Sequence, residues 1–186
     1  MPNLPDKLQK ERSVLLLIDM QEKFRSLIYQ MPEVVACCAR VIRFCERLGI
    51  PIMVTEHYSR GLGPTLMELR NLITTFKPLE KITFSCDGDD GFRSALAKLD
   101  RDQIIICGIE THVCVYQTAY DLLADGRQVA VAVDAVSSRS PHDRQIGLAR
   151  MNQLGTQNMG VEMIMFEILR RAKTDDFKDV ADILKE

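Results

Sequence analysis

The side chains of Asp19, Lys81 and Cys114 are of the types that nucleophilic attack on a carbonyl requires. A cysteine thiolate is the nucleophile, a carboxylate beside it can accept the thiol proton, and a lysine can keep that carboxylate charged. Cys114 is predicted on the first turn of a helix, just past an apolar run that ends at Gly108. Unpaired N–H groups and the helix dipole favour a thiolate there, and the same N–H groups can bind an oxyanion.

Each of these three residues also has an ordinary structural interpretation. Cys114 shares a helix face with Thr118 and Asp121, whereas the apolar stripe of that helix consists of Val115, Ala119 and Leu122. That spacing predicts Cys114 outside the core, but a buried structural thiol stays an alternative. Asp19 ends an apolar run and can equally cap a loop, and Lys81 taken alone is typical of a solvated strand residue.

Short apolar runs alternate with stretches of helical spacing along nearly the whole chain. The predicted strands cover 13–20, 50–56, 81–85, 103–108, 128–136 and 157–161. The predicted helices cover 32–49, 91–100, 112–126, 140–155 and 162–172, with a capped C-terminal helix over 174–186. This alternation predicts a three-layer α/β/α sandwich of the Rossmann-like class with about six parallel strands. Residues 1–186 would form a single domain, in which 1–12 is a short N-terminal extension.

The predicted topology brings the chemically useful residues to one place. In an open parallel sheet, ligands bind at the edge where the carboxyl ends of the strands meet. The first two predicted strands end near Asp19 and His57, the third lies around Lys81, and the fourth leads into Cys114. We therefore expect the acid, the lysine and the cysteine to converge there.

The composition argues against several classes of function. A formal net charge of -2, from 24 basic and 26 acidic residues, and an aromatic content of 6% offer little to nucleic acid or to an anionic membrane. No apolar stretch approaches the ~20 residues of a transmembrane helix, and no secretory signal is recognised. The six cysteines form no C-x-x-C pair. We therefore expect a reduced, cytoplasmic protein that binds neither nucleic acid nor membrane.

Motifs for cofactors and metals are missing from the sequence. There is no G-x-G-x-x-G after the first strand, no G-x-x-x-x-G-K-[ST] and no G-x-S-x-G. Cys107, His112 and Cys114 are close in sequence, but Cys107 lies on the strand side of a sharp turn, which argues against a metal cluster. We expect neither a cofactor nor a metal.

Three blocks, LLLIDMQEKF, EKITFS and CGIETHVCVYQTAYDLL, occur in this order and resemble the isochorismatase-like cysteine hydrolase family. The resemblance runs from about residue 14 to 171 and is most specific in GIETHVC. It implies a catalytic triad of Asp19, Lys81 and Cys114, and a homo-oligomer such as a dimer, a tetramer or a larger ring. It also implies a cis peptide bond between Ile109 and Glu110, with the N–H groups of Glu110 and Cys114 facing an oxyanion.

The chain also departs from two branches of that family. Nicotinamidases carry an aspartate and histidines after the second strand, where TEHYSRGLGPTLMELR has His57 but no D-x-H pattern. Neither the metal nor the nicotinamidase activity therefore carries over. True isochorismatases lack the nucleophilic cysteine, so Cys114 argues against isochorismate hydrolysis. The resemblance is to the metal-free branch, whose substrates are mostly unassigned.

The residues and the resemblance together predict a hydrolase that cleaves a C–N bond of a small amide through a thioester at Cys114. The residues expected to line its substrate pocket are Phe24, His57, Tyr58 and Tyr116. One alternative is a non-catalytic oligomeric scaffold or binding protein that retains the site. Another is a redox-responsive thiol protein, for which Cys107 is the only cysteine expected near Cys114.

Overall fold

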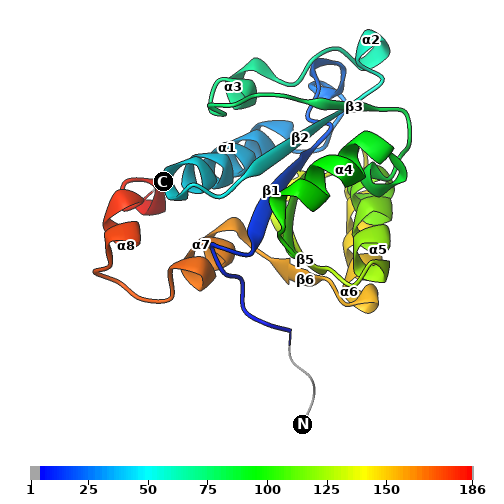
Figure 1. Ribbon diagram of the computed structural model, residues 1–186. Coiled ribbons are helices and arrows are strands. Elements are labelled where there is room, and N and C mark those ends of the chain that lie inside the picture. Colours follow the sequence, from blue (N-terminus) through cyan, green and yellow to red (C-terminus); the bar gives the residue numbers. More distant parts are fainter. Residues whose placement is uncertain (1–4, 186) are drawn as a thin grey trace.

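Six parallel strands form a sheet through the middle of the molecule (Figure 1). The computed structural model describes residues 5–185. Its strands are β1 (Ser13–Ile18), β2 (Ile52–His57), β3 (Leu79–Lys81), β4 (Gln103–Ile109), β5 (Gln128–Ser137) and β6 (Gln157–Met159). Their order across the sheet is β3-β2-β1-β4-β5-β6, which confirms the predicted α/β/α class.

Helices cover both faces of this sheet (Figure 1). One face carries α1 (Met31–Leu48), α7 (Val161–Leu169) and α8 (Asp175–Asp179), and the other carries α4 (Asp90–Leu99), α5 (Tyr116–Ala124) and α6 (Pro141–Leu154). Side chains alternate along a strand, so Leu15 and Leu17 of β1 join the first hydrophobic cluster and Leu16 and Ile18 join the second. None of the described helices is long and apolar enough to cross a membrane.

The direction of strand addition reverses between β1 and β4, which are neighbours in the sheet. A reversal of this kind leaves a crevice at the carboxyl ends of the two strands, where α/β proteins bind ligands. Ile18 of β1 pairs with Gly108 of β4 at this point. A Cβ atom at Gly108 would lie 2.1 Å from the Ile18 carbonyl oxygen, and Gly108 has a φ of +116°. The crevice therefore requires glycine at position 108.

The third strand is shorter than predicted and lies earlier in the chain. The prediction of a strand over 81–85 is wrong beyond Lys81, where β3 ends. The Lys81 ammonium donates to the carbonyl oxygens of Thr83 and Phe84, at 3.1 and 3.4 Å. Because the chain curls around this ammonium, it cannot remain extended, and Ile82 and Phe84 become exposed. The one-turn helices α2 (Ser59–Leu62) and α3 (Met67–Arg70), between β2 and β3, are not predicted by the sequence pattern.

Over the described residues 174–185, the C-terminal segment is helical in two short pieces instead of one, and residue 186 of the predicted helix lies outside them. Thr174 caps α8 as predicted, because its hydroxyl accepts a hydrogen bond from the Phe177 N–H at 3.1 Å. The helix ends at Asp179, and the 3-10 helix η4 (Ile183–Lys185) follows it. Arg47 of α1 donates to the Asp179 carbonyl oxygen at 2.6 Å, and Arg40 of α1 donates to carbonyl oxygens of η4. These arginines bind carbonyl groups that a continuous helix would use internally.

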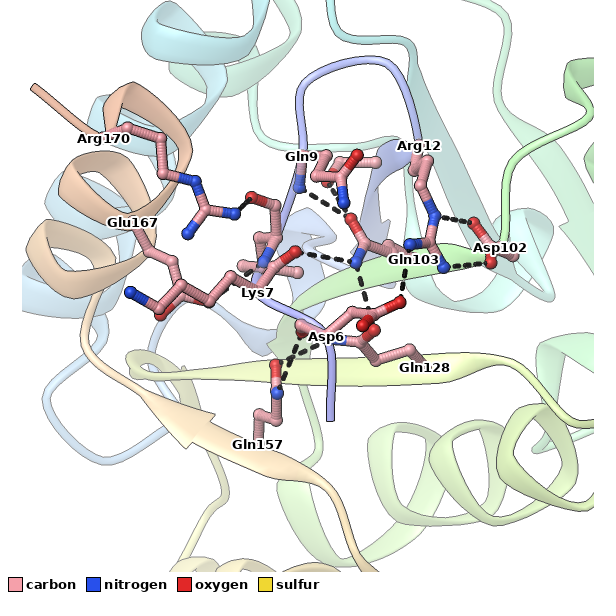
Figure 2. A network of polar contacts seen from close by, with 12 residues as sticks. Asp6, Lys7, Gln9, Arg12, Asp102, Gln103, Gln128, Gln157, Glu167 and Arg170 are labelled. Carbon is pink, nitrogen blue, oxygen red and sulfur yellow. Dashed lines mark hydrogen bonds and ion pairs between the residues drawn. The ribbon is translucent and has the colours of Figure 1, made fainter. Parts of the chain in front are cut away.

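Glutamines line the opposite, amino edge of the sheet (Figure 2). Gln103, Gln128 and Gln157 are the first residues of β4, β5 and β6, and their side-chain amides join in a row at 3.0 and 3.1 Å. The Gln103 side chain also accepts from the Gln9 N–H at 2.7 Å and donates to the Lys7 carbonyl oxygen at 3.1 Å. The described part of the N-terminal extension, from residue 5 onward, is thus held across this edge by a strand side chain; residues 1–4 of the predicted extension lie outside the described residues.

Candidate active site

Asp19 is the first residue after β1 and is 1% exposed. Its backbone has a φ of +52°, in the left-handed region, and its N–H donates to the Thr55 carbonyl oxygen at 3.2 Å. Left-handed backbone is uncommon outside glycine, although aspartate tolerates it better than most residues. The conformation ends the strand and leaves the carboxylate at the crevice between β1 and β4.

Two buried donors hold the Asp19 carboxylate. Lys81 Nζ donates to Oδ2 at 2.7 Å, and the Thr55 hydroxyl donates to Oδ1 at 2.7 Å. The lysine and aspartate side chains are only 1% and 2% exposed, so Lys81 is not the solvated strand residue that its sequence context alone indicates. Burial is the largest single influence on the pKa of Lys81 and lowers it, but the charge of Asp19, the hydrogen bond to it and the nearby thiols together raise it, and the net pKa lies above the ordinary value.

Cys114 lies in the π-helical turn η3 (Thr111–Val115), which leads directly into α5. Helix α6 packs tightly against this turn at Gly147, where a Cβ atom would lie 2.9 Å from the His112 Cα. The His112 imidazole is in turn hydrogen-bonded to the Ser138 hydroxyl, with 3.0 Å between Nδ1 and Oγ. The π turn that carries Cys114 is therefore supported from α6 and from the end of β5.

Cys114 is more buried than the sequence predicts. The prediction assumed a regular α-helix, in which Cys114 and Thr118 lie off the apolar stripe. The π turn changes the angular phase of the residues within it, and Cys114 is 8% exposed and packs in the hydrophobic cluster with Val115. Thr118 is fully buried and its hydroxyl accepts from the Cys86 N–H at 2.9 Å.

The electrostatics of Cys114 also differ from the expected low-pKa thiolate. Burial first, and then the negative charge of Asp19, raise the pKa of Cys114 above the ordinary value for a thiol. The positive charge of Lys81 lowers this pKa, but by less than burial and Asp19 raise it. The resting site therefore holds a protonated thiol close to a carboxylate, so the proton must be transferred when the thiol reacts.

Asp19 and Cys114 line one cavity of about 80 Å³ at the carboxyl edge of the sheet. The other lining residues are Phe24, His57, Phe84, Ile109, Glu110 and Val113. Of the four expected substrate contacts, Phe24 and His57 are in this lining, and Tyr58 and Tyr116 are not. The Tyr58 ring lies against Gly61 and is largely exposed, and Tyr116 pairs with Tyr120 along α5.

One wall of this cavity is a pair of stacked rings. The ring centroids of His57 and Phe84 are 5.6 Å apart, with an angle of 20° between the ring planes. Burial, and then the positive charge of Lys81, lower the pKa of His57, so its imidazole is neutral at pH 7. Sequence reasoning missed Phe84, although the residue is part of the quoted block EKITFS, because the block was assigned to a strand.

Glu110 borders the cavity on the side of β4. The peptide bond between Ile109 and Glu110 is cis, as the sequence resemblance implies. The Glu110 side chain is nearly buried, and its Oε2 accepts from the backbone N–H of Arg139 at 2.9 Å and from the Arg139 Nε at 3.1 Å. The negative charge of this carboxylate is thus paired within the protein.

A second cysteine, Cys86, lies close to the site in the segment after β3. The sequence pattern did not indicate Cys86. Its thiol lies 3.8 Å from the Thr55 hydroxyl that binds Asp19, and burial raises its pKa to about 12. Cys107, the expected neighbour, instead belongs to the hydrophobic cluster on the other face of the sheet from Cys114. All six cysteines are free thiols, and within residues 5–185 no three His, Cys, Asp or Glu side chains gather in a metal-binding arrangement.

The sequence of this chain is similar to a protein family and to several named proteins. The isochorismatase domain model matches residues 13–163. A zebrafish (Danio rerio) protein named isochorismatase domain-containing protein 2 is 42% identical over 178 residues, which are 96% of this chain and 89% of that protein. The human protein of the same name is 40% identical over 178 residues, 94% of this chain and 83% of that protein.

Solved structures of the same fold cover nearly the whole chain. A structure described as MAR1 ribonuclease from Caenorhabditis elegans is 35% identical, with a TM-score of 0.92, and covers 97% of this chain and 93% of its own. The YcaC gene product from Escherichia coli, described as an octameric hydrolase of unknown specificity, is 23% identical with a TM-score of 0.91. It covers 97% of this chain and 91% of its own, and at this identity it shows the fold alone.

Proposed function

We propose that this chain, which belongs to the isochorismatase domain family, is a cysteine-dependent hydrolase that cleaves the C–N bond of a small amide. The observation that carries the proposal is the cavity that Asp19 and Cys114 line together, with Lys81 and Thr55 bound to the two carboxylate oxygens of Asp19. An oriented carboxylate beside a nearly buried thiol is the arrangement that nucleophilic catalysis by cysteine requires.

In this mechanism Asp19 is the general base. Each of its oxygens already accepts one hydrogen bond and keeps a further lone pair, so the carboxylate can also take the proton of Cys114. Because the pKa of Cys114 is raised in the resting site, proton transfer accompanies attack on the carbonyl carbon instead of preceding it. The sulfur–carbon bond forms as the thiol proton passes to Asp19.

The tetrahedral intermediate then collapses to a thioester. We place its oxyanion near the N–H groups of Glu110 and Cys114, where charge stabilisation by oriented donors lowers the barrier. Asp19 returns the proton to the leaving nitrogen, and the C–N bond breaks. A water molecule, deprotonated by the same Asp19, attacks the thioester and releases the carboxylic acid and the Cys114 thiol.

We further propose that the protein acts in the cytoplasm as a homo-oligomer. The E. coli neighbour, described as octameric, shares the fold. Several large apolar side chains are exposed in the single chain, among them Met67, Ile82 and Met163. Sedimentation velocity of the purified protein tests this assembly, and a monomer at micromolar concentration would contradict it.

A second candidate is RNA cleavage, since the 35% identical neighbour is described as a ribonuclease. The cavity lining contains two carboxylates and neither lysine nor arginine, whereas phosphodiesters are bound mainly by cationic side chains. We therefore favour the amide. The competing activity is tested by incubating the protein and its Cys114→Ala variant with the same RNA, because cleavage by the wild type alone would favour the ribonuclease.

The deciding experiment for the amidase is a comparison of wild type with Cys114→Ala. We expect the wild type to release ammonia from a panel of small primary amides and the variant to release none. Hydroxylamine added during turnover should intercept the thioester as a hydroxamic acid. Circular dichroism checks that the variant is folded. If the folded variant releases as much ammonia as the wild type, the mechanism is wrong.

A further inference from the structure

The charges around the cavity determine which amides fit it. We propose that the substrates are small amides that carry no net charge, with an apolar acyl group next to the carbonyl. This inference rests on the proposed function and adds the substrate class. It follows from three features: how the charges of the cavity lining are paired, how the buried cation Lys81 beside the cavity is used, and what forms the cavity walls.

Both carboxylates in the lining are already paired. Asp19 binds Lys81 and Thr55, and Glu110 binds the backbone and the guanidinium of Arg139. A cationic substrate therefore meets no carboxylate whose charge is free, and burying its ammonium group without a counter-charge is costly.

The buried cation beside the cavity is fully occupied as well. An ammonium group has three N–H donors. Those of Lys81 find three acceptors in the protein: Asp19 Oδ2 at 2.7 Å, the Thr83 carbonyl oxygen at 3.1 Å and the Phe84 carbonyl oxygen at 3.4 Å. A substrate carboxylate would have to displace one of them. His57, which is in the lining, is neutral near pH 7 and brings no positive charge.

Arg139 is a second cation near the cavity, through its pair with Glu110 of the lining. Its Nε faces Glu110 at 3.1 Å, while its side chain is 62% exposed and is not part of the cavity lining. The negative charge of Glu110 beside Arg139 repels an anionic substrate, and water screens the attraction of the exposed Arg139 guanidinium for it. Arg139 therefore orients Glu110 instead of binding substrate.

The walls and the volume favour a compact apolar group. Phe24, Phe84, Ile109 and Val113 supply apolar surface, and the stacked His57 ring supplies a flat face. One water-sized group, or one non-hydrogen atom of a ligand, takes about 10–15 Å³ of cavity volume. The cavity of about 80 Å³ therefore holds on the order of five to eight non-hydrogen atoms. Short aliphatic amides are of this size.

The test uses pairs of amides that differ in charge but not in the number of non-hydrogen atoms. Isovaleramide is matched with malonamate, in which a carboxylate replaces the isopropyl group, and propionamide with glycinamide, in which an ammonium replaces the methyl group. Binding is measured on Cys114→Ala by saturation-transfer NMR and calorimetry at pH 7, and turnover is measured separately on the wild type. We expect the neutral member of each pair to bind about 100-fold more tightly, since the charged member buries an unpaired charge.

Three variants, two at His57 and one at Arg139, test the charges by binding alone, so their outcome does not depend on the proposed chemistry. His57→Lys adds an unpaired cation to the lining and should narrow or reverse the preference for isovaleramide over malonamate, whereas His57→Gln, which stays neutral, should keep it. Tight binding of malonamate that Arg139→Gln abolishes would overturn the inference and identify Arg139 as a carboxylate anchor. Selective binding of neutral amides without wild-type turnover would contradict the proposed hydrolysis but support the substrate class.

Discussion

Polar side chains lie at both edges of the sheet, but the two edges use them in opposite ways. At the carboxyl edge the polar groups are few, charged and buried, and the Asp19–Lys81 pair is almost inaccessible to water. At the amino edge they are numerous and partly exposed, and Figure 2 shows Arg12 bound to Asp102 and Asp6 around the glutamine row.

The difference lies in what the polar groups bind. At the amino edge, side chains satisfy backbone groups of the N-terminal extension, such as the Leu8 N–H on Glu167 and the Leu8 carbonyl on Arg170. These hydrogen bonds hold the N-terminal segment in place, and they do so without burying a charged side chain. At the carboxyl edge a charge is kept out of water next to a thiol, which is costly for stability and useful for chemistry. Variants at the two edges should therefore separate effects on turnover from effects on folding.

The largest effect is expected from Asp19→Asn. The amide cannot accept the thiol proton, so turnover should fall by roughly 10²–10⁴-fold. Removing the Asp19 charge leaves Lys81 to act on Cys114, so the pKa of Cys114 should fall and alkylation by iodoacetamide should begin at lower pH than in the wild type. At pH 7.5 we expect at least about a tenfold faster reaction, the change that one pKa unit brings. Site-resolved mass spectrometry would measure both rates, and slower alkylation in the variant would contradict the electrostatic account.

Lys81→Met should have the largest effect on folding. It leaves the Asp19 carboxylate buried without its cation, and breaking a buried pair costs roughly 3–5 kcal/mol. The double variant Lys81→Met with Asp19→Asn removes both charges and should recover most of this loss. Urea unfolding of the three proteins gives the free energies. If the double variant is no more stable than Lys81→Met, the unpaired Asp19 charge is not the cause of the stability loss in Lys81→Met.

Gln103→Leu tests the amino edge. The change removes the acceptor of the Gln9 N–H and the donor to the Lys7 carbonyl oxygen. These hydrogen bonds are only partly buried, and losing one typically costs about 0.5–1.5 kcal/mol, so the free energy of unfolding should fall by roughly that amount while kcat stays at the wild-type value. A loss of kcat as large as the loss in Asp19→Asn would show that the two edges are not independent.

The smallest effect is expected from Arg12→Ala, at an exposed pair. The Arg12–Asp102 pair is partly solvated, so at pH 7 the loss should be below about 1 kcal/mol and should shrink in high salt. The hydrogen bond and charge of Arg12 hold the pKa of Asp102 below the ordinary 3.8, so the pair stabilises the fold above that pH. Protonation of Asp102 removes this contribution as the pH falls through its folded-state pKa. Thermal unfolding between pH 7 and 2.5 should show the wild type and Arg12→Ala converging at the acidic end.

The sequence by itself determined the class of fold and most of its strands and helices. Continuous apolar runs indicate strands buried on both faces, and helical spacing indicates the helices between them, so the class of fold and the meeting of the strand ends follow from local patterns. Asp19 and Cys114 could be selected because each follows a predicted strand, whereas Lys81 opens the predicted strand 81–85 and was selected as part of a coherent set with them and by the family resemblance. The family resemblance supplied the cis peptide bond, which no local pattern predicts.

Only the tertiary structure decided the environment of those residues. The end of β3 at Lys81, the π turn at Cys114 and the ring stack of His57 on Phe84 each depend on contacts between segments far apart in the chain. The same holds for the pKa of Cys114, which local reasoning placed too low because a helix start favours a thiolate. Burial and the charge of Asp19 act through space to raise this pKa, and neither can be seen in the residues that surround Cys114 in the sequence.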